Sequence, residues 1–322
     1  MAPVQTDPRV TSIQPGGGIV MNLELAWGYV RRWYLWIFRR GFIRRMERTR
    51  RGEGNVCPHP VFDPRDVKYY RNLGGYYWEQ KDDPFAWRDR LPFARAGLAE
   101  LLVFSLLTFV PAAFCLWAVL GLGARGAWGW FFGIDAAALL VIGGLIVWFF
   151  RDPRRRIPTG DGVVVCPADG KIVEIEELDH DEFIGGPAVK VGIFLSIFNV
   201  HINRVPMACR VESLAYEPGR FLNALRPESA RENERMIVKL RETGPGGRRL
   251  IVTQITGAIA RRIVCWVKPG DELSVGEQFG MIKLGSRTEL IVPREPGLEV
   301  CVRNGQAVQA GSTVVARYGA EV

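Results

Sequence analysis

The chain has 322 residues, of which 48% are hydrophobic, and carries a net charge of +8. This length allows one or two domains with their own cores, and the charge favours an acidic partner such as a nucleic acid or an anionic membrane. No RNA-binding or zinc-finger signature accompanies the charge, so we expect no nucleic-acid partner and consider a membrane first.

The six cysteines form no CxxC pair, and the chain has only three histidines. This spacing argues against a structural zinc site, and we predict no metal site. Scattered cysteines in apolar surroundings are typical of buried thiols in a reducing compartment. The first residues lack the basic start and apolar stretch of a secretory signal. Because residues 1–20 are rich in Pro and Gly, we expect them to be disordered.

Residues 1–92 form a basic, aromatic N-terminal arm, in which residues 22–51 are expected to hold an amphipathic helix. This segment carries arginine pairs at positions 31/32, 39/40 and 44/45. At helical spacing, its apolar face bears Trp33, Leu35, Trp36 and Phe42. A surface helix packed on the protein is one interpretation. The favoured one is a helix in the interface of an anionic membrane, which accommodates arginine and tryptophan well. Residues 52–92 show no recognisable motif.

Residues 93–150 contain two long apolar runs separated only by "ARG". Each run has the roughly 20 apolar residues that a membrane span needs, which predicts a two-helix transmembrane hairpin. A buried hairpin in a soluble core is disfavoured by two consecutive runs of this length. Arginines precede the first run and "RDPRRR" follows the second, whereas the connecting loop carries only Arg125. The positive-inside rule therefore places residues 151–322 on the cytoplasmic side of the inner membrane.

Residues 151–322 alternate short Val/Ile-rich runs with Gly, Pro and Asp turns. In 189–197 every second residue is apolar, which predicts a strand, and only 221–235 could hold a helix. Two segments, "GVVVCPADGKIVEI" and "GLEVCVRNGQAVQAGSTVVA", share a strand, Gly turn and strand pattern that is typical of lipoyl-type sandwiches. The predicted fold class is a mainly β catalytic domain with lipoyl-like sandwich or hairpin elements, preceded by the helical transmembrane hairpin.

Three polar residues of this domain are candidates for chemistry. Asp169 ends a strand before a glycine, His201 follows a long apolar strand, and Ser286 follows Gly285 between two predicted strands. Each alone has a structural explanation as a hairpin turn, a buried histidine or a Gly-Ser turn. Together they supply the carboxylate, base and nucleophile of an activated serine. The G-x-S-x-G pattern of the common hydrolase elbow does not surround Ser286.

The sequence resembles the phosphatidylserine decarboxylase proenzyme family of the short, pyruvoyl-dependent type. The matching motifs follow the family's order over about 148–318: "WFFRDPRRRIP", "CPADGKI", "FLSIFNVHINRVP", "YEPGRF", "ENER", "QITGAIARRIVCWVKPGD" and "GEQFGMIKLGSR". For residues 1–90 we can name no counterpart in the family, and this long basic, aromatic arm departs from the compact short form. The family often has Gly where this chain has Cys209.

The resemblance implies that the chain cuts itself between Gly285 and Ser286. By analogy, Ser286 attacks the carbonyl of Gly285 to form an ester, with His201 as base and Asp169 orienting it. Elimination then leaves a β chain of residues 1–285 and an α chain of residues 286–322, which stay together. Ser286 becomes an N-terminal pyruvoyl group, the cofactor that forms a Schiff base with the substrate amine.

The expected function is decarboxylation of phosphatidylserine to phosphatidylethanolamine at an anionic membrane surface, and the sequence leaves a homo-oligomer open. One alternative is the decarboxylation of a different serine phospholipid, of the archaetidylserine type. Another is a non-catalytic, membrane-anchored, lipoyl-like adaptor, which requires a modifiable lysine at a hairpin tip. The turns "ADGK" and "RNGQ" lack the lysine between methionines that such carriers favour.

Overall fold

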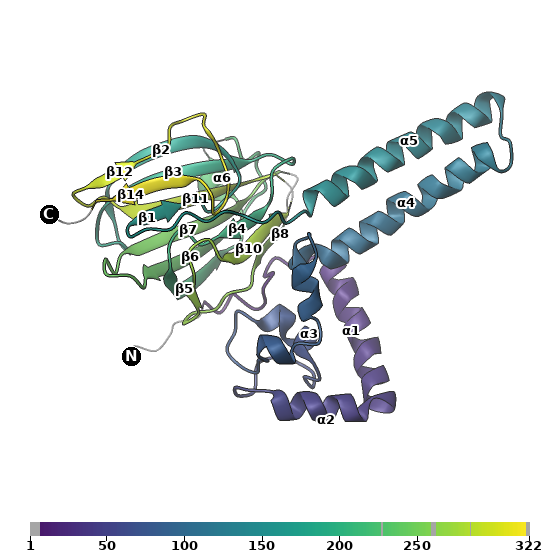
Figure 1. Cartoon of the computed structure of the whole chain (residues 1–322), viewed down its shortest axis with the longest axis horizontal. Helices are drawn as coiled ribbons and strands as arrows, with labels where there is room; N and C mark the ends of the chain where they lie inside the picture. Colours follow the sequence, from purple (N-terminus) through teal and green to yellow (C-terminus); the bar gives the residue numbers. More distant parts are fainter. Residues whose placement is uncertain (1–6, 227, 259–261, 284, 320–322) are drawn as a thin grey trace.

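The computed structural model describes residues 7–226, 228–258, 262–283 and 285–319. Two long helices, α4 (Leu98–Leu120) and α5 (Gly126–Phe149), form a hairpin that projects from a mainly β body, and smaller helices gather beside its foot (Figure 1). The predicted order, a helical hairpin followed by a mainly β domain, is confirmed.

All named strands lie in the body and pair antiparallel in three sheets. They are β1 (Val163–Val165), β2 (Gly170–Asp181), β3 (Gly186–Leu195), β4 (Ile202–Arg204), β5 (Cys209–Glu217), β6 (Arg235–Glu242), β7 (Arg249–Thr256), β8 (Arg262–Cys265), β9 (Glu272–Leu273), β10 (Gln278–Lys283), β11 (Ser286–Pro293), β12 (Leu298–Val300), β13 (Ala307–Val308) and β14 (Val314–Tyr318). The large sheet has the order β13-β2-β3-β11-β7-β6-β5-β9, and the two smaller ones are β1-β14-β12 and β4-β10-β8. Among the described residues of the β domain, a single short helix, α6 (Ser229–Glu232), lies between strands, within the segment predicted to allow one.

The two similar sequence segments pair with each other in the structure. β1 pairs with β14, and β2 pairs with β13, so the strands of the first segment bond to those of the second. Their alternating apolar side chains, among them Val164, Ile172, Val308 and Val315, enter the main hydrophobic core. The chain that follows Ser286 is thereby built into the same core as the chain before it.

The hairpin helices α4 and α5 are long and apolar enough to cross a membrane, by length and composition. Large apolar side chains such as Leu107 and Phe114 remain exposed on them. A Cβ at Gly143 of α5 would lie 2.7 Å from the ring of Phe109 on α4, so this glycine lets the two helices approach closely. These features suggest membrane association.

Residues 7–18 pack against the β body, so the expectation of disorder is wrong for them, while residues 1–6 lie outside the described part. Val10 is 1% exposed and belongs to the main core. The backbone N–H of Cys265 donates to the carbonyl of Ile13 at 2.8 Å, and that of Tyr216 donates to the Asp7 carboxylate at 2.9 Å. These two hydrogen bonds and the buried side chains of Val10 and Ile13 thus fix a segment whose Pro and Gly content suggested disorder.

The predicted helical segment 22–51 contains two helices, α1 (Ile19–Phe38) and α2 (Arg40–Thr49), separated by the non-helical Arg39. Short turns follow as α3 (Pro64–Val67), η1 (Lys68–Tyr70), η2 (Gln80–Asp82), η3 (Ala86–Arg90) and η4 (Arg95–Gly97).

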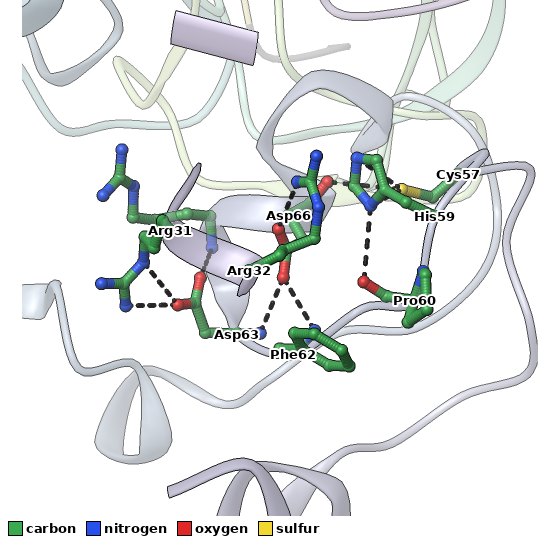
Figure 2. A network of polar contacts seen from close by, with 9 residues as sticks. Arg31, Arg32, Cys57, His59, Pro60, Phe62, Asp63 and Asp66 are labelled. Carbon is green, nitrogen blue, oxygen red and sulfur yellow. Dashed lines mark hydrogen bonds and ion pairs between the residues drawn. The ribbon is translucent and has the colours of Figure 1, made fainter. Parts of the chain in front are cut away.

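The first arginine pair of the arm is engaged by carboxylates of the same arm. Arg31 pairs with Asp63, and Arg32 pairs with Asp66 at 3.0 Å (Figure 2). Asp66 also accepts backbone N–H groups, including that of Phe62. These ion pairs therefore link α1 to the segment around α3 within the arm. Trp33 and Trp36 of α1 remain exposed.

Candidate active site

Ser286 opens β11 in the middle of the large sheet. It lies opposite Leu195 of β3 and Thr256 of β7, and it is fully buried. Its Oγ has no hydrogen-bond partner among the described residues. A buried hydroxyl without a partner has lost its hydration without compensation, and such groups call for an explanation in terms of strain or chemistry.

Gly285 holds the turn that leads into this strand. Its φ of 58° lies in the left-handed region, which glycine adopts without the steric cost of a Cβ. A Cβ at this position would meet only Ile197, at 3.9 Å, so the space around the residue is open. The backbone conformation, and not a lack of space, therefore accounts for glycine at this position.

The carbonyl of Gly285 lies directly over Gly257, just after β7. A Cβ built at Gly257 would overlap the Gly285 carbonyl oxygen and lie 3.1 Å from its carbonyl carbon. The absence of a side chain at Gly257 thus permits this close approach. Gly257 was not among the predicted site residues, although it lies within the "QITGAIARRIVCWVKPGD" motif.

His201 lies on the amide side of the same turn. The backbone N–H of Gly285 donates to its Nε2 at 3.1 Å, so Nδ1 carries the proton and donates to the Asn199 carbonyl at 2.9 Å. Burial lowers the pKa of His201 to about 4, and the nearby positive charge of Arg151 acts in the same direction. The imidazole is therefore neutral near pH 7, with its lone pair directed at Gly285.

Asp169 lies in a different environment from the one predicted. Its carboxylate accepts two hydrogen bonds from Arg155, at 2.7 and 2.9 Å, and one from the backbone N–H of Ala310 at 2.8 Å. Within the described residues, no hydrogen bond joins it to His201, whose Nδ1 is taken by Asn199. The structure thus brings His201, Gly285 and Ser286 together and holds Asp169 against Arg155.

A buried polar network next to Ser286 was also missed from the sequence. The Asn203 amide donates to Thr288 Oγ1 at 3.0 Å, and the Gln254 amide donates to Asn203 Oδ1 at 2.9 Å. Side chains alternate along a strand, so Thr288 shares a face with Ser286. That alternation was readable from the sequence, but the partners on β4 and β7 were not. The network joins β11, which carries the candidate nucleophile, to β4 of a smaller sheet and to the neighbouring β7.

No group of three or more potential metal ligands occurs among the residues whose placement is described. The site instead offers a buried hydroxyl, a neutral imidazole and a glycine peptide in an uncommon conformation. These are the parts required for an intramolecular attack of a hydroxyl on a peptide carbonyl.

Comparison with known proteins gives the family. A profile of the phosphatidylserine decarboxylase family matches residues 142–316. The phosphatidylserine decarboxylase proenzyme of Rhodopirellula baltica is 52% identical over 252 residues, which cover 78% of this chain and 99% of that protein. This chain belongs to the phosphatidylserine decarboxylase family. Proteins with the same name from Syntrophus aciditrophicus and Symbiobacterium thermophilum are 44% and 45% identical over 53% and 58% of the chain, covering 78% and 84% of their own lengths.

The likeness to the Rhodopirellula protein is longer than the family profile, so it continues into the helical part before residue 142. The reaction of the family, release of CO₂ from phosphatidylserine to leave phosphatidylethanolamine, is the activity of this chain. Membership of a proenzyme family also implies cleavage into two chains and formation of a pyruvoyl group.

Proposed function

We propose that this chain cuts itself between Gly285 and Ser286 and uses the pyruvoyl group formed from Ser286 to decarboxylate phosphatidylserine. The observation that carries the proposal is the fully buried Ser286 hydroxyl, which has no hydrogen-bond partner among the described residues and directly follows a left-handed Gly285 whose N–H donates to His201. The Ser286 hydroxyl, the His201 imidazole and the Gly285 carbonyl are adjacent in the chain or in space.

Self-cleavage begins when the hydrogen bond to His201 Nε2 passes from the Gly285 amide to the Ser286 hydroxyl. The imidazole takes the hydroxyl proton as Ser286 Oγ bonds to the Gly285 carbonyl carbon, and the C–N bond breaks to give an ester and a free amine. Loss of the Ser286 α-proton then expels the Gly285 carboxylate. The resulting enamine tautomerises and is hydrolysed, which releases ammonia and leaves the N-terminal ketone.

The fit of the pyruvoyl group is supported by the surroundings of Ser286. The residue is enclosed between β3 and β7, which pair with β11 along its length. These ladders, together with β12, β13 and β14, hold residues 286–319 in the β domain after the cut. Cleavage therefore frees the Gly285 end without separating the two chains.

The pyruvoyl group supplies an electron sink for the pair of electrons released when CO₂ leaves. The chain's own residues bind the substrate and move its protons. His201 lies beside the reacting residue and can hold the proton that is transferred to or from the substrate. It holds this proton on Nε2, because its Nδ1–H stays bonded to the Asn199 carbonyl. Protein side chains around Ser286 exclude water from the reacting atoms.

We assign Asp169 a positioning role that works through Arg155 and not through a bond to the imidazole. Besides burial, which lowers the pKa of Arg151, the nearby charges of Asp169 and Arg155 shift it, Asp169 upward and Arg155 downward. In addition to the larger effect of burial, the positive charge of Arg151 in turn lowers the pKa of His201. Loss of the Asp169 carboxylate leaves excess positive charge near the base. Asp169→Asn is therefore expected to slow cleavage without abolishing it.

We further propose that the hairpin spans the inner membrane with the β domain on the cytoplasmic side. The end of α5 contacts the site directly, because the Phe149 ring lies 4.5 Å from the His201 ring. Arg151 donates to the Phe198 carbonyl at 2.9 Å, and Phe198 itself is 58% exposed. These contacts support a site close to the membrane boundary. A surface hollow lined by Arg154, Arg155 and Arg156 offers charge for an anionic headgroup.

The test is Ser286→Ala in the full chain, with Ser229→Ala as the matched control. Both serines are fully buried, but the Ser229 hydroxyl donates to the Arg226 carbonyl away from the cut. Ser286→Ala should give neither the 286–322 fragment nor phosphatidylethanolamine, and Ser229→Ala should give both. Phosphatidylethanolamine formation by purified Ser286→Ala would overturn the cofactor assignment.

A further inference from the structure

Lys283, the last residue of β10, lies two positions before Gly285 and is tied to segments far away in the sequence. Its side chain is only 11% exposed, and its ammonium group forms an ion pair with Glu100 in the first turn of α4. It also donates to Gln14 Oε1 of the N-terminal segment at 3.0 Å. The Lys283 ammonium group therefore links three parts of the chain: β10, which leads to Gly285, the hairpin helix α4 and the N-terminal arm.

The end of β10 is also hydrogen-bonded to the backbone of His201, the proposed base. The backbone N–H of Ile282 donates to the carbonyl of His201 at 3.1 Å, and Met281 pairs with Ile202 of β4. A displacement of this strand end would move His201 and Gly285 together with Lys283. The geometry of the proposed cleavage thus depends on where Lys283 is held.

Both hairpin helices reach this point of the β domain. Glu100 of α4 contacts Lys283, while Phe149 of α5 packs against the ring of His201. Figure 1 shows the foot of the hairpin beside β8 and β10. The hairpin is therefore joined to the site by one charged and one aromatic contact.

A buried ion pair is a poor source of stability, because the loss of hydration offsets much of the attraction between the charges. Burial lowers the pKa of Lys283, and the charge of Glu100 opposes this effect. Such pairs are better suited to fixing one arrangement of the chain, since removing one partner leaves the other charge uncompensated.

We propose that Glu100 is a positioning residue for self-cleavage. Through Lys283 it fixes the segment that leads to Gly285, so that cutting requires the hairpin to be docked on the β domain. This inference rests on the proposed cleavage between Gly285 and Ser286. It goes beyond that proposal by giving the membrane hairpin a part in making the cofactor.

The experiment follows appearance of the 286–322 fragment by pulse labelling of full-length chains in membranes. Glu100→Gln should slow it about ten- to a hundredfold, the range expected for a misplacement of about 1 Å. Asp66→Asn is the matched control, because its pair with Arg32 is about as buried, with side chains 8% and 9% exposed, and joins two segments of the N-terminal arm (Figure 2). Equal slowing in both variants would mean that the loss of any buried ion pair in the helical part slows cleavage, and would overturn the inference.

A double variant separates positioning from the cost of an uncompensated charge. Glu100→Gln with Lys283→Met removes both charges, so the folded chain should regain thermal stability while cleavage stays slow. Wild-type cleavage in the double variant would show that the ionic contact is dispensable. Unaltered cleavage in Glu100→Gln would refute the inference alone, whereas a wild-type chain that is never cut at 285/286 would refute the proposed function.

Discussion

Gly257→Ala should slow self-cleavage by adding one methyl group next to the Gly285 carbonyl. The new Cβ would overlap the Gly285 carbonyl oxygen and lie 3.1 Å from its carbonyl carbon. Carbon atoms in favourable contact are about 3.5–4.0 Å apart, so the Gly285 carbonyl must retreat by roughly half to one ångström. The carbonyl that retreats is the electrophile of the proposed reaction.

A misplacement of about 1 Å at reacting atoms costs about 10²-fold in rate, which is roughly 2.7 kcal/mol of activation free energy. Intact mass spectrometry of chains sampled over time measures the loss of uncut protein and the gain of residues 286–322. Thermal unfolding of the same samples reports whether the fold has survived.

Gly219→Ala is the control for this variant. A Cβ at Gly219 would be equally crowded by backbone, lying 2.6 Å from the Glu234 nitrogen, but it does not meet Gly285. Gly219→Ala should lower stability while its folded chains cut normally. If folded Gly257→Ala cuts at the wild-type rate, the Gly285 carbonyl is not the electrophile in the arrangement described.

Three further outcomes follow from the site. Unfolded histidine has a pKa near 6.5, whereas burial lowers the pKa of His201 to about 4. The free energy of unfolding should therefore be unaffected by this residue above pH 6.5 and should fall by about 3 kcal/mol as the pH falls to 4. Denaturant titrations should show this loss in wild type and not in His201→Gln. Gly285→Ala should destabilise the uncut chain by about 1–2 kcal/mol, since φ is 58°, and an unchanged midpoint would contradict the left-handed turn. Asp169→Asn should slow fragment release measured by mass; complete loss, as in Ser286→Ala, would instead indicate a direct catalytic role.

Features with a local origin were predictable from the sequence. The alternation in 189–197 predicted β3, and the lengths of the two apolar runs predicted the hairpin of α4 and α5. The fold class followed from these patterns. Gly285 and Ser286 could be proposed because they interrupt a strand pattern in a recognisable motif, and the structure places His201 beside them.

Features that depend on distant partners were not predictable in the same way. Period-two alternation tells which face of a strand a residue occupies, but not what packs against that face. It therefore gave no sign that Arg155 takes the Asp169 carboxylate, or that Glu100 pairs with Lys283. The segment 7–18 was misjudged for a similar reason, since its order comes from strands far along the chain.

The most direct test of the account is the intact mass of the full-length chain purified from membranes, combined with Edman sequencing of its smaller fragment. The account predicts two fragments that join at 285/286, with residues 286–322 blocked at the N-terminus by the pyruvoyl group. A single uncut chain in an active preparation, or a fragment with a free Ser286 amine, would contradict it.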